Sequence, residues 1–317
     1  MPDTSSFKLP RELLIAGAAA EVGIFDALQS GPLTLEDLRA RTKTDSRALW
    51  VVAEALVALG YLKYEGTRLK LTGEAYRVLF DPGYKNYTGF SFMHTYNLLS
   101  SWVQLPEVLR SGRPAVKKQS PGRLKNYIAA MSRHARASAP HIADYCLQGL
   151  PPKPKVLDVG GGPLTYAVAF AQKGAVVTVL DLPEVIDMML PELEPGLPVQ
   201  MVKGDFTRGL PRGPFDLVYL GNVCHIYGEK ENRQLFRNVA RELKAGGRLV
   251  INDMIRGTGV MPALFAVNML VNTPSGGTWT YEQYKAWLED AGFVVDPYRE
   301  VAERQLITAH RTPGAAP

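Results

Sequence analysis

The carboxyl-terminal half of the chain alternates short β-branched apolar runs with longer segments of helical periodicity. The apolar runs are KVLDVG, VVTVLDL, VQMVKGD, FDLVYLGN and GRLVINDM, and segments such as PEVIDMML and NRQLFRNVARELKAGG separate them. Short apolar runs bounded by turn residues are typical of buried strands, and strands that alternate with helices are typical of a doubly wound parallel sheet. We therefore expect an α/β domain with a Rossmann-like sheet over residues 151–317.

The last apolar segments of this domain have a different spacing. FVVDPYREV and RQLITAHR lie so close together that no helix fits between them. Parallel neighbours need a connection of about a dozen residues, whereas antiparallel neighbours need only a short turn. The sheet is therefore predicted to end in an antiparallel strand.

Residues 1–80 show helical periodicity followed by a short alternation. ELLIAGAAAEVGIFDAL and SRALWVVAEALVALG are apolar at helical spacing, Thr34 and Asp45 are expected amino-terminal caps, and YLKYEGTRLKLT is typical of a β-hairpin. Helix, turn, helix and hairpin in this order predict a winged helix. The helix in 46–60 is apolar nearly all round, so we expect it to be buried in a packing or dimerisation module that does not bind nucleic acid.

Residues 81–150 are predicted to form a helical linker that closes over the site as a lid. YTGFSFMHTYNLLSSWVQLPEVLRSG and RLKNYIAAMSRHARASAPHIADYCL have helical patterns, and the prolines of GLPPKPK mark the boundary with the α/β domain. Most of the aromatic side chains here are expected to pack between helices. The side chains best suited to line a substrate pocket are Phe92, His94, Tyr127, Met131 and His134.

Composition narrows the class of protein. The 317 residues carry a formal charge of +5, which bears on solubility more than on a partner. Only Cys146 and Cys224 are present, without metal-ligand spacing, so neither a disulfide scaffold nor a metal site is expected. No apolar run approaches the ~20 residues of a membrane span. The first residues lack the pattern of a secretory signal, and we expect a cytoplasmic protein with no membrane partner.

Acidic residues stand at the ends of three successive predicted strands. Asp158 precedes a glycine-rich loop, Asp181 ends the second strand and Asp205 ends the third. A carboxylate beside a pyrophosphate would repel it, but the same carboxylate favours a cationic ligand end such as an amine beside a sulfonium. A carboxylate at the second strand end can accept from both ribose hydroxyls. The third can accept from an adenine amino group, with the ring of Phe206 alongside.

The glycine loop does not complete a dinucleotide fingerprint. Gly160 and Gly162 fit the Gly-x-Gly-x-x-Gly pattern, but Thr165 stands at its last position. Together with the three aspartates, this pattern favours S-adenosylmethionine over NAD. Leu182, next to the second aspartate, and Asn222, at the end of the fourth strand, complete the expected cofactor set.

His225 follows the fourth predicted strand, in GNVCHIYG. The carboxyl ends of strands are the ligand-binding edge of an open α/β sheet. An imidazole can take the proton from a hydroxyl as its oxygen attacks a methyl group, so His225 is a candidate general base. The alternative is that it caps the strand or the following helix. Asp253, in INDMI, is a candidate for a carboxylate that orients the imidazole, with a structural cap as the alternative.

Together these motifs resemble the small-molecule O-methyltransferases, over almost the whole chain. The resemblance is carried by VLDVGGGP, VTVLDLPEVI, GDF, GNVCH, ELKAGGRLVINDMI and NML. It implies a class I S-adenosylmethionine fold with a seven-stranded sheet, a reversed last strand and a winged-helix domain that forms a homodimer. It also implies cofactor contacts and a general base, which fall on Asp158, Gly160, Gly162, Asp181, Asp205, Phe206 and His225.

The chain departs from this family around the histidine. Ile226 and Tyr227 stand where plant-like members have Asp and Trp, and Gly221 stands where a lysine is frequent. Thr278 or Trp279 stands at the place of a glutamate that orients the histidine. Without a carboxylate partner, the imidazole would be a weaker base with a less fixed tautomer.

The expected activity is methyl transfer from S-adenosylmethionine to a hydroxyl of a small, aromatic or polyketide-like metabolite. Tyr227, Asn268 and Trp279 join the lid residues as candidates for contact with this acceptor. The alternatives are a C- or N-methyltransferase, a relative that uses the cofactor without methylating, and a winged-helix regulator that senses S-adenosylmethionine.

Overall fold

A computed structural model describes residues 8–116 and 122–312. The chain forms two compact units, which are described separately. Unit 1 comprises residues 1–100 and 119–130, and unit 2 comprises residues 101–118 and 131–317. The segment 81–150 is therefore divided between the two units, and two of its helices, α6 (Phe92–Trp102) and α8 (Arg123–Arg136), have residues in both.

Unit 1 contains the helices and the hairpin expected near the amino terminus. Its helices are α1 (Arg11–Glu21), α2 (Ile24–Leu28), α3 (Leu35–Thr42), α4 (Ser46–Ala58) and α5 (Gly73–Phe80), and its strands are β1 (Leu33–Thr34), β2 (Leu62–Glu65) and β3 (Arg68–Leu71). The strands form one antiparallel sheet in the order β1-β3-β2. Thr34 and Asp45 accept from the backbone N–H of Asp37 and Ala48, which confirms both predicted caps.

The burial of α4 differs from the expectation for an all-round apolar helix. Leu49, Ala53 and Leu56 lie in the core of unit 1, but Trp50 is 52% exposed and Val51 is 51% exposed. One chain covers only one side of this helix, so the single chain does not bury it completely. The exposed side is an apolar surface that a second molecule could cover.

Unit 2 contains a mostly parallel sheet with an antiparallel edge. Its strands are β4 (Lys155–Val159), β5 (Val176–Asp181), β6 (Val199–Lys203), β7 (Phe215–Gly221), β8 (Leu243–Asn252), β9 (Phe293–Val295), β10 (Arg299–Val301) and β11 (Arg304–Arg311). The order is β10-β11-β8-β7-β4-β5-β6, and β9 pairs with β11. The strands from β6 to β8 are mutually parallel, and β11 is antiparallel to β8, as predicted.

The described part of this sheet has eight strands, whereas seven were expected. The difference lies in FVVDPYREV, which forms two short strands on β11 in place of one. Pro297 separates these two strands, and proline has no N–H to donate to a sheet ladder. The chain therefore leaves the sheet at this residue and returns as β10.

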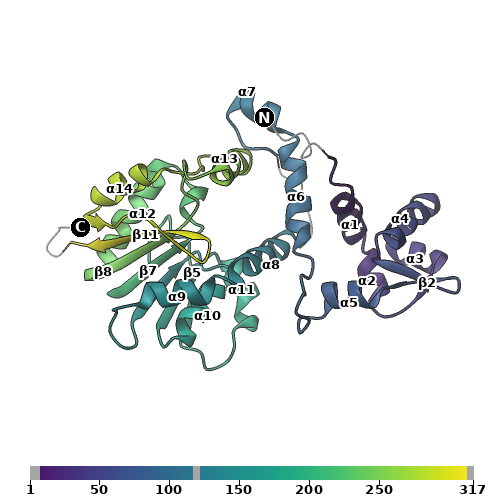
Figure 1. Ribbon diagram of the computed structural model, residues 1–317, viewed down its shortest axis with the longest axis horizontal. Coiled ribbons are helices and arrows are strands. Elements are labelled where there is room, and N and C mark those ends of the chain that lie inside the picture. The colour runs from purple at the N-terminus through teal and green to yellow at the C-terminus, as the bar shows by residue number, and fades with distance from the viewer. Residues whose placement is uncertain (1–7, 117–121, 313–317) are drawn as a thin grey trace. The chain divides into compact units, whose positions relative to one another are not determined.

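Helices cover both faces of the sheet (Figure 1). One face packs against α9 (Ala139–Leu147), α10 (Thr165–Gln172) and α11 (Pro183–Met189), and the other against α12 (Glu229–Glu242) and α14 (Tyr281–Glu289). Alternation along β4 provides both contacts, because Val156 faces the first group while Leu157 and Val159 face the second. Two further helices, α7 (Leu105–Ser111) and α13 (Val260–Asn272), pack against each other. None of the helices in the described ranges is long and apolar enough to span a bilayer.

Helix α14 begins with a capping box. Thr280 Oγ1 accepts from the N–H of Gln283 at 3.2 Å, and Gln283 Oε1 accepts from the N–H of Thr280 at 2.9 Å. Thr280→Ala removes one of these bonds, so we expect the free energy of unfolding to fall by about 1 kcal/mol in urea titrations. Lys285→Ala, on the exposed side of the same helix, is the control and should change it by less than about 0.5 kcal/mol.

Candidate active site

The predicted site residues of unit 2 gather at one edge of the parallel sheet. Because β4, β5, β7 and β8 run parallel as neighbours, their carboxyl ends lie together. Asp158 lies near the end of β4, Asp181 ends β5, and His225 and Asp253 come shortly after β7 and β8.

The loop between β4 and α10 is tightly packed and needs its glycines. Gly160 has a φ of +68° and donates its N–H to Leu180 O at 2.8 Å. A Cβ at Gly161 would lie 2.7 Å from the side chain of Val179 and 2.9 Å from Asp158 Oδ2. The loop backbone therefore approaches β5 more closely than a side chain would permit.

Asp158 is a buried carboxylate without a compensating partner. Its side chain is 1% exposed, and Oδ2 has no hydrogen-bond partner among the described residues. Burial and the nearby charge of Asp181 raise the pKa of Asp158 to about 7. Buried polar groups are normally paired, so an oxygen left without a donor at a strand end fits a site for a ligand that supplies the donor.

Asp181 braces the glycine loop against the second strand. Its Oδ2 accepts from Gly162 N at 2.8 Å and its Oδ1 accepts from Leu182 N at 2.7 Å. Burial raises the pKa of Asp181, and these two backbone hydrogen bonds oppose that increase. Each carboxylate oxygen has further lone pairs, so the group can also accept from a diol.

Asp205 and Phe206 lie beyond the end of β6. Thr207 donates both its N–H and its hydroxyl to Asp205 Oδ1, at 2.9 and 2.6 Å, and these bonds lower the pKa of Asp205. The ring of Phe206 meets the ring of Tyr227 edge to face, with centroids 5.2 Å apart. Tyr227 therefore lies beside the residue expected next to the adenine ring. A cavity of about 220 Å³, also lined by residues of α12, adjoins this pair.

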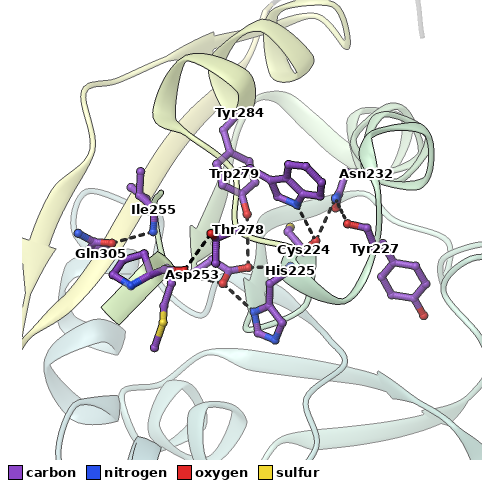
Figure 2. Close-up of polar contacts among 12 residues, drawn as sticks. Cys224, His225, Tyr227, Asn232, Asp253, Ile255, Thr278, Trp279, Tyr284 and Gln305 are labelled. Carbon is purple, nitrogen blue, oxygen red and sulfur yellow. Dashed lines mark hydrogen bonds and ion pairs between the residues drawn. The ribbon is translucent and has the colours of Figure 1, made fainter. Parts of the chain in front are cut away.

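His225 is held by a carboxylate from the neighbouring strand. It lies in a short 3₁₀ turn (Cys224–Ile226) after β7 and is 6% exposed. Its Nδ1 is 2.7 Å from Asp253 Oδ1, and its backbone N–H donates to Asp253 Oδ2 at 3.0 Å (Figure 2). Asp253, the candidate orienting carboxylate, therefore contacts the imidazole, although Thr278 and Trp279 stand at the place of the family's glutamate. Asp253 directly follows β8, which pairs with β7 in parallel, so the residues after the two strands are neighbours.

Asp253 is surrounded by donors. Besides His225, the N–H of Met254 donates to Oδ1 at 2.8 Å, and the hydroxyl of Tyr284 donates to Oδ2 at 3.4 Å. Two backbone N–H groups, one hydroxyl and His225 Nδ1 therefore surround this buried carboxylate. Tyr284 comes from α14 and is fully buried, and no local sequence pattern marks it as part of the site.

The two residues at the expected glutamate position contact other groups. Thr278 donates its hydroxyl to Pro262 O at 3.0 Å, and Trp279 donates its indole N–H to Cys224 O at 3.3 Å.

The amino-terminal cap of α12 is Gly228, so the alternative that His225 caps this helix is wrong. The ring of Phe265, on α13, meets the imidazole edge to face with centroids 4.8 Å apart, a contact that sequence reasoning missed.

Backbone geometry explains two features after β7. Asn222 has a φ of +59° and donates its N–H to Asn252 O at 2.9 Å, so it forms the sharp exit from the strand. A Cβ at Gly221 would lie 2.7 Å from the ring of Tyr219. The buried tyrosine therefore occupies the space that a lysine at this position would need.

The other candidate substrate residues are divided between the two units. Unit 1 contains Phe92, His94 and Tyr127. Phe92 packs against the core of this unit, and the rings of His94 and Tyr127 meet edge to face with centroids 5.3 Å apart. Met131 and His134 lie on the unit 2 part of α8. Burial and the charges of two arginines lower the pKa of His134. Asn268, on α13, accepts from the indole N–H of Trp102 at 3.0 Å.

The cysteines and acidic residues form no further centre. Cys146 and Cys224 are buried free thiols, and burial raises the pKa of both. Cys224 lies in the apolar core between the sheet and α12. Within residues 8–116 and 122–312, no three His, Cys, Asp or Glu side chains are grouped so as to hold a metal ion.

Comparison with known proteins identifies the chain's relatives. A family model described as an O-methyltransferase domain matches residues 111–294. The tetracenomycin polyketide synthesis 8-O-methyltransferase TcmO of Streptomyces glaucescens is 28% identical, over 87% of this chain and 86% of that protein. The N,N-dimethyltransferase OxyT of Streptomyces rimosus is 26% identical, over 88% and 84%. The solved structure of PigF with SAH shares the fold, with a TM-score of 0.76 and 22% identity over 98% of this chain and all of that one.

Proposed function

Because this chain belongs to the O-methyltransferase domain family, whose methyl donor is S-adenosylmethionine, we propose that it methylates a hydroxyl of a small, planar aromatic or polyketide-like metabolite. The observation that carries the proposal is the pairing of His225 with Asp253 at the sheet edge that also holds the glycine loop. A relative named for a polyketide 8-O-methyl transfer supports the acceptor class.

The strand ends fit the methyl donor. We place its amine beside Asp158, whose unpartnered Oδ2 needs a donor, and its ribose hydroxyls on Asp181. Asp205 and Phe206 would hold the adenine. Tyr227, whose ring meets that of Phe206, would then contact the cofactor in place of the acceptor. The remaining expected contacts are Gly160, Gly162, Leu182 and Asn222. When bound, S-adenosylmethionine supplies an electrophilic methyl group on a sulfonium.

His225 then takes up the proton of the acceptor, and Asp253 holds the imidazole in place. His225 Nδ1 lies 2.7 Å from Asp253 Oδ1. With its proton on Nδ1, donated to this carboxylate, the imidazole has Nε2 left as the acceptor for the proton of the substrate hydroxyl. Asp253 stabilises the imidazolium that forms, because its negative charge is 2.7 Å from Nδ1. Phe265 covers the imidazole and limits the access of water to it.

A second candidate is transfer to nitrogen. A relative named as an N,N-dimethyltransferase covers most of this chain. An amine attacks with its own lone pair, so the reaction needs no base before the methyl group moves. The two functions are separated by the effect of replacing His225, which should be large for a hydroxyl acceptor and small for an amine.

We propose that the amino-terminal part is a winged-helix dimerisation domain (residues 1–80), followed by a helical lid (81–150) and the methyltransferase domain (151–317). The exposed Trp50 and Val51 of α4 and the half-exposed Tyr64 of β2 support contact with a second copy of the chain. Burial of such side chains against another chain removes apolar area from water. Phe92, His94, Tyr127, Met131, His134 and Asn268 stay candidates for the acceptor side.

Calorimetric titration with S-adenosylmethionine, its demethylated product and NAD tests the cofactor part of this proposal. We expect the first two to bind and NAD to give no signal. Asp181→Ala should weaken binding of S-adenosylmethionine by about 10- to 100-fold, because it removes charge-assisted hydrogen bonds. The control is Asp187→Ala, which removes an exposed carboxylate paired with Lys203 and should leave the affinity unchanged. Equal affinities for the two variants would refute the ribose assignment.

A further inference from the structure

The turn that carries His225 is held by an asparagine that does not touch the imidazole. We call Cys224–Gly228 the His225 turn. Asn232, in the first turn of α12, is fully buried and directs its side-chain Nδ2 at three carbonyl oxygens of this turn. Two of these are Cys224 O at 2.9 Å and Tyr227 O at 3.0 Å (Figure 2). The third is Gly228 O at 3.0 Å.

The loop Ser275–Trp279 holds the same turn from another direction. The N–H of Gly277 donates to His225 O at 2.9 Å, and the indole N–H of Trp279 donates to Cys224 O at 3.3 Å. A Cβ at Gly276 would lie 2.4 Å from His225 O and 2.7 Å from Ile226 O. The loop therefore reaches the turn only because residue 276 has no side chain.

The side-chain amide of Asn232 is a polar group at a position where an apolar side chain would pack equally well. Its neighbours on the buried face of α12, Leu235, Phe236 and Val239, are all apolar. Its Oδ1 has no hydrogen-bond partner among the described residues, so the amide retains an uncompensated acceptor in the core. An apolar residue would avoid this cost. The position keeps an amide whose donors all serve the His225 turn.

We propose that Asn232 and Trp279 are positioning residues for the methyl transfer proposed above, on which this inference rests. They fix the peptide of His225 from the side opposite to Asp253, so that Nδ1 stays in hydrogen-bond contact with the carboxylate and Nε2 stays free to accept a proton. In this chain Trp279, at the position where a glutamate was expected, acts on the backbone of the turn while Asp253 acts on the ring.

The test reads the tautomer of His225 directly. Two-bond ¹⁵N–¹H spectra of protein labelled in its five histidines resolve Nδ1–H from Nε2–H, and His225→Gln assigns the signal. The parent should show the Nδ1–H form in its neutral state. Asn232→Ala should lose this form and give an exchange-averaged signal. The control is Val239→Ala, which opens a cavity in the same helix without touching the turn and should keep it.

Two further variants keep the inference testable if Asn232→Ala does not fold. Trp279→Phe removes the indole N–H and its second ring, and Gly276→Ala forces the loop away from the turn, because its Cβ would lie 2.4 Å from His225 O. Both should shift the tautomer in the same direction as Asn232→Ala. An unchanged tautomer in every variant would overturn the inference, and so would an equal loss in Val239→Ala, since that loss would follow from general loosening.

The tautomer result and the proposed function fail separately. Titration of the same samples with S-adenosylmethionine tests the function, because a parent protein that binds none would defeat it. Variants that lose the tautomer but bind S-adenosylmethionine within twofold of the parent support the positioning role. Variants that lose both would place Asn232 and Trp279 in the cofactor site and overturn that role.

Discussion

Asp253→Asn should lower kcat for a phenolic acceptor by about 10³- to 10⁴-fold and change the Kd for S-adenosylmethionine by less than about twofold. Three donors surround the carboxylate, the N–H of Met254 on Oδ1 and the N–H of His225 and the hydroxyl of Tyr284 on Oδ2. The proposed Nδ1–H of His225 is the fourth, on Oδ1. The asparagine amide has an NH₂ group in place of one carboxylate oxygen. The two donors that bonded to that oxygen then face another donor and lose their hydrogen bonds. If the NH₂ faces His225 Nδ1, the imidazole shifts its proton to Nε2 and loses its acceptor.

Steady-state assays after a screen of phenolic acceptors measure this loss, and calorimetry measures the cofactor Kd. In His225→Gln, kcat should fall by a similar factor, because His225 and Asp253 act together in the proton transfer. Asp216→Asn is the matched control, since Asp216 is a buried carboxylate at the opposite end of β7, bonded to Lys155 N and close to Lys244 Nζ. A normal kcat in Asp253→Asn, or an equal loss in Asp216→Asn, would show that Asp253 is not part of the proton transfer.

Sequence periodicity predicted the strands that build this site. Asp158, Asp181 and His225 were recognised because each follows a β-branched run, and the period of the run predicts where the strand ends. The antiparallel last strand followed from the short connection before it. These features depend on residues close together in the chain, which is why a local pattern contained them.

The partner of His225 was harder to predict. Asp253 was a candidate, but 28 residues separate it from His225, and only the order of strands makes them neighbours. The resemblance directed attention to Thr278 and Trp279, which instead bond to Pro262 and Cys224. Side-chain partners across a sheet edge depend on strand order and turn geometry, and neither has a sequence period.

The contacts of the His225 turn could not be predicted from the sequence, because they also depend on turn geometry. Asn232 stands in ENRQLF, where an asparagine in the first turn of a helix is common and suggests nothing more. Its three carbonyl partners lie at −4, −5 and −8 positions, in a turn whose shape only the folded chain defines. The Phe206–Tyr227 contact has the same origin, because it joins two loops that follow different strands.

Asp158→Asn should stabilise the protein at pH 8 while weakening its affinity for S-adenosylmethionine. Burial raises the pKa of Asp158 from 3.8 to about 7, so the folded state holds a proton that the unfolded state releases from about pH 4. Between these two values the folded state binds more protons, and the free energy of unfolding of the parent falls as pH rises. Above pH 7 the full cost of the buried charge is present, and an uncharged amide removes about 3 kcal/mol of it.

The same charge is what a cationic amine needs. In the parent, affinity for S-adenosylmethionine should rise by up to about tenfold per pH unit between pH 5.5 and 7, as Asp158 loses its proton. In Asp158→Asn this dependence should largely disappear, and the affinity at pH 7 should fall by about 10- to 100-fold. Urea titrations at pH 5.5 and 8 and calorimetry across that range measure both effects. A variant that is less stable at pH 8 yet binds normally would mean that Asp158 supports the loop and does not meet the ligand. If Asp158→Asn is more stable at pH 8 and binds S-adenosylmethionine more weakly, the carboxylate serves binding. Its charge then lowers the free energy of unfolding of the protein without ligand.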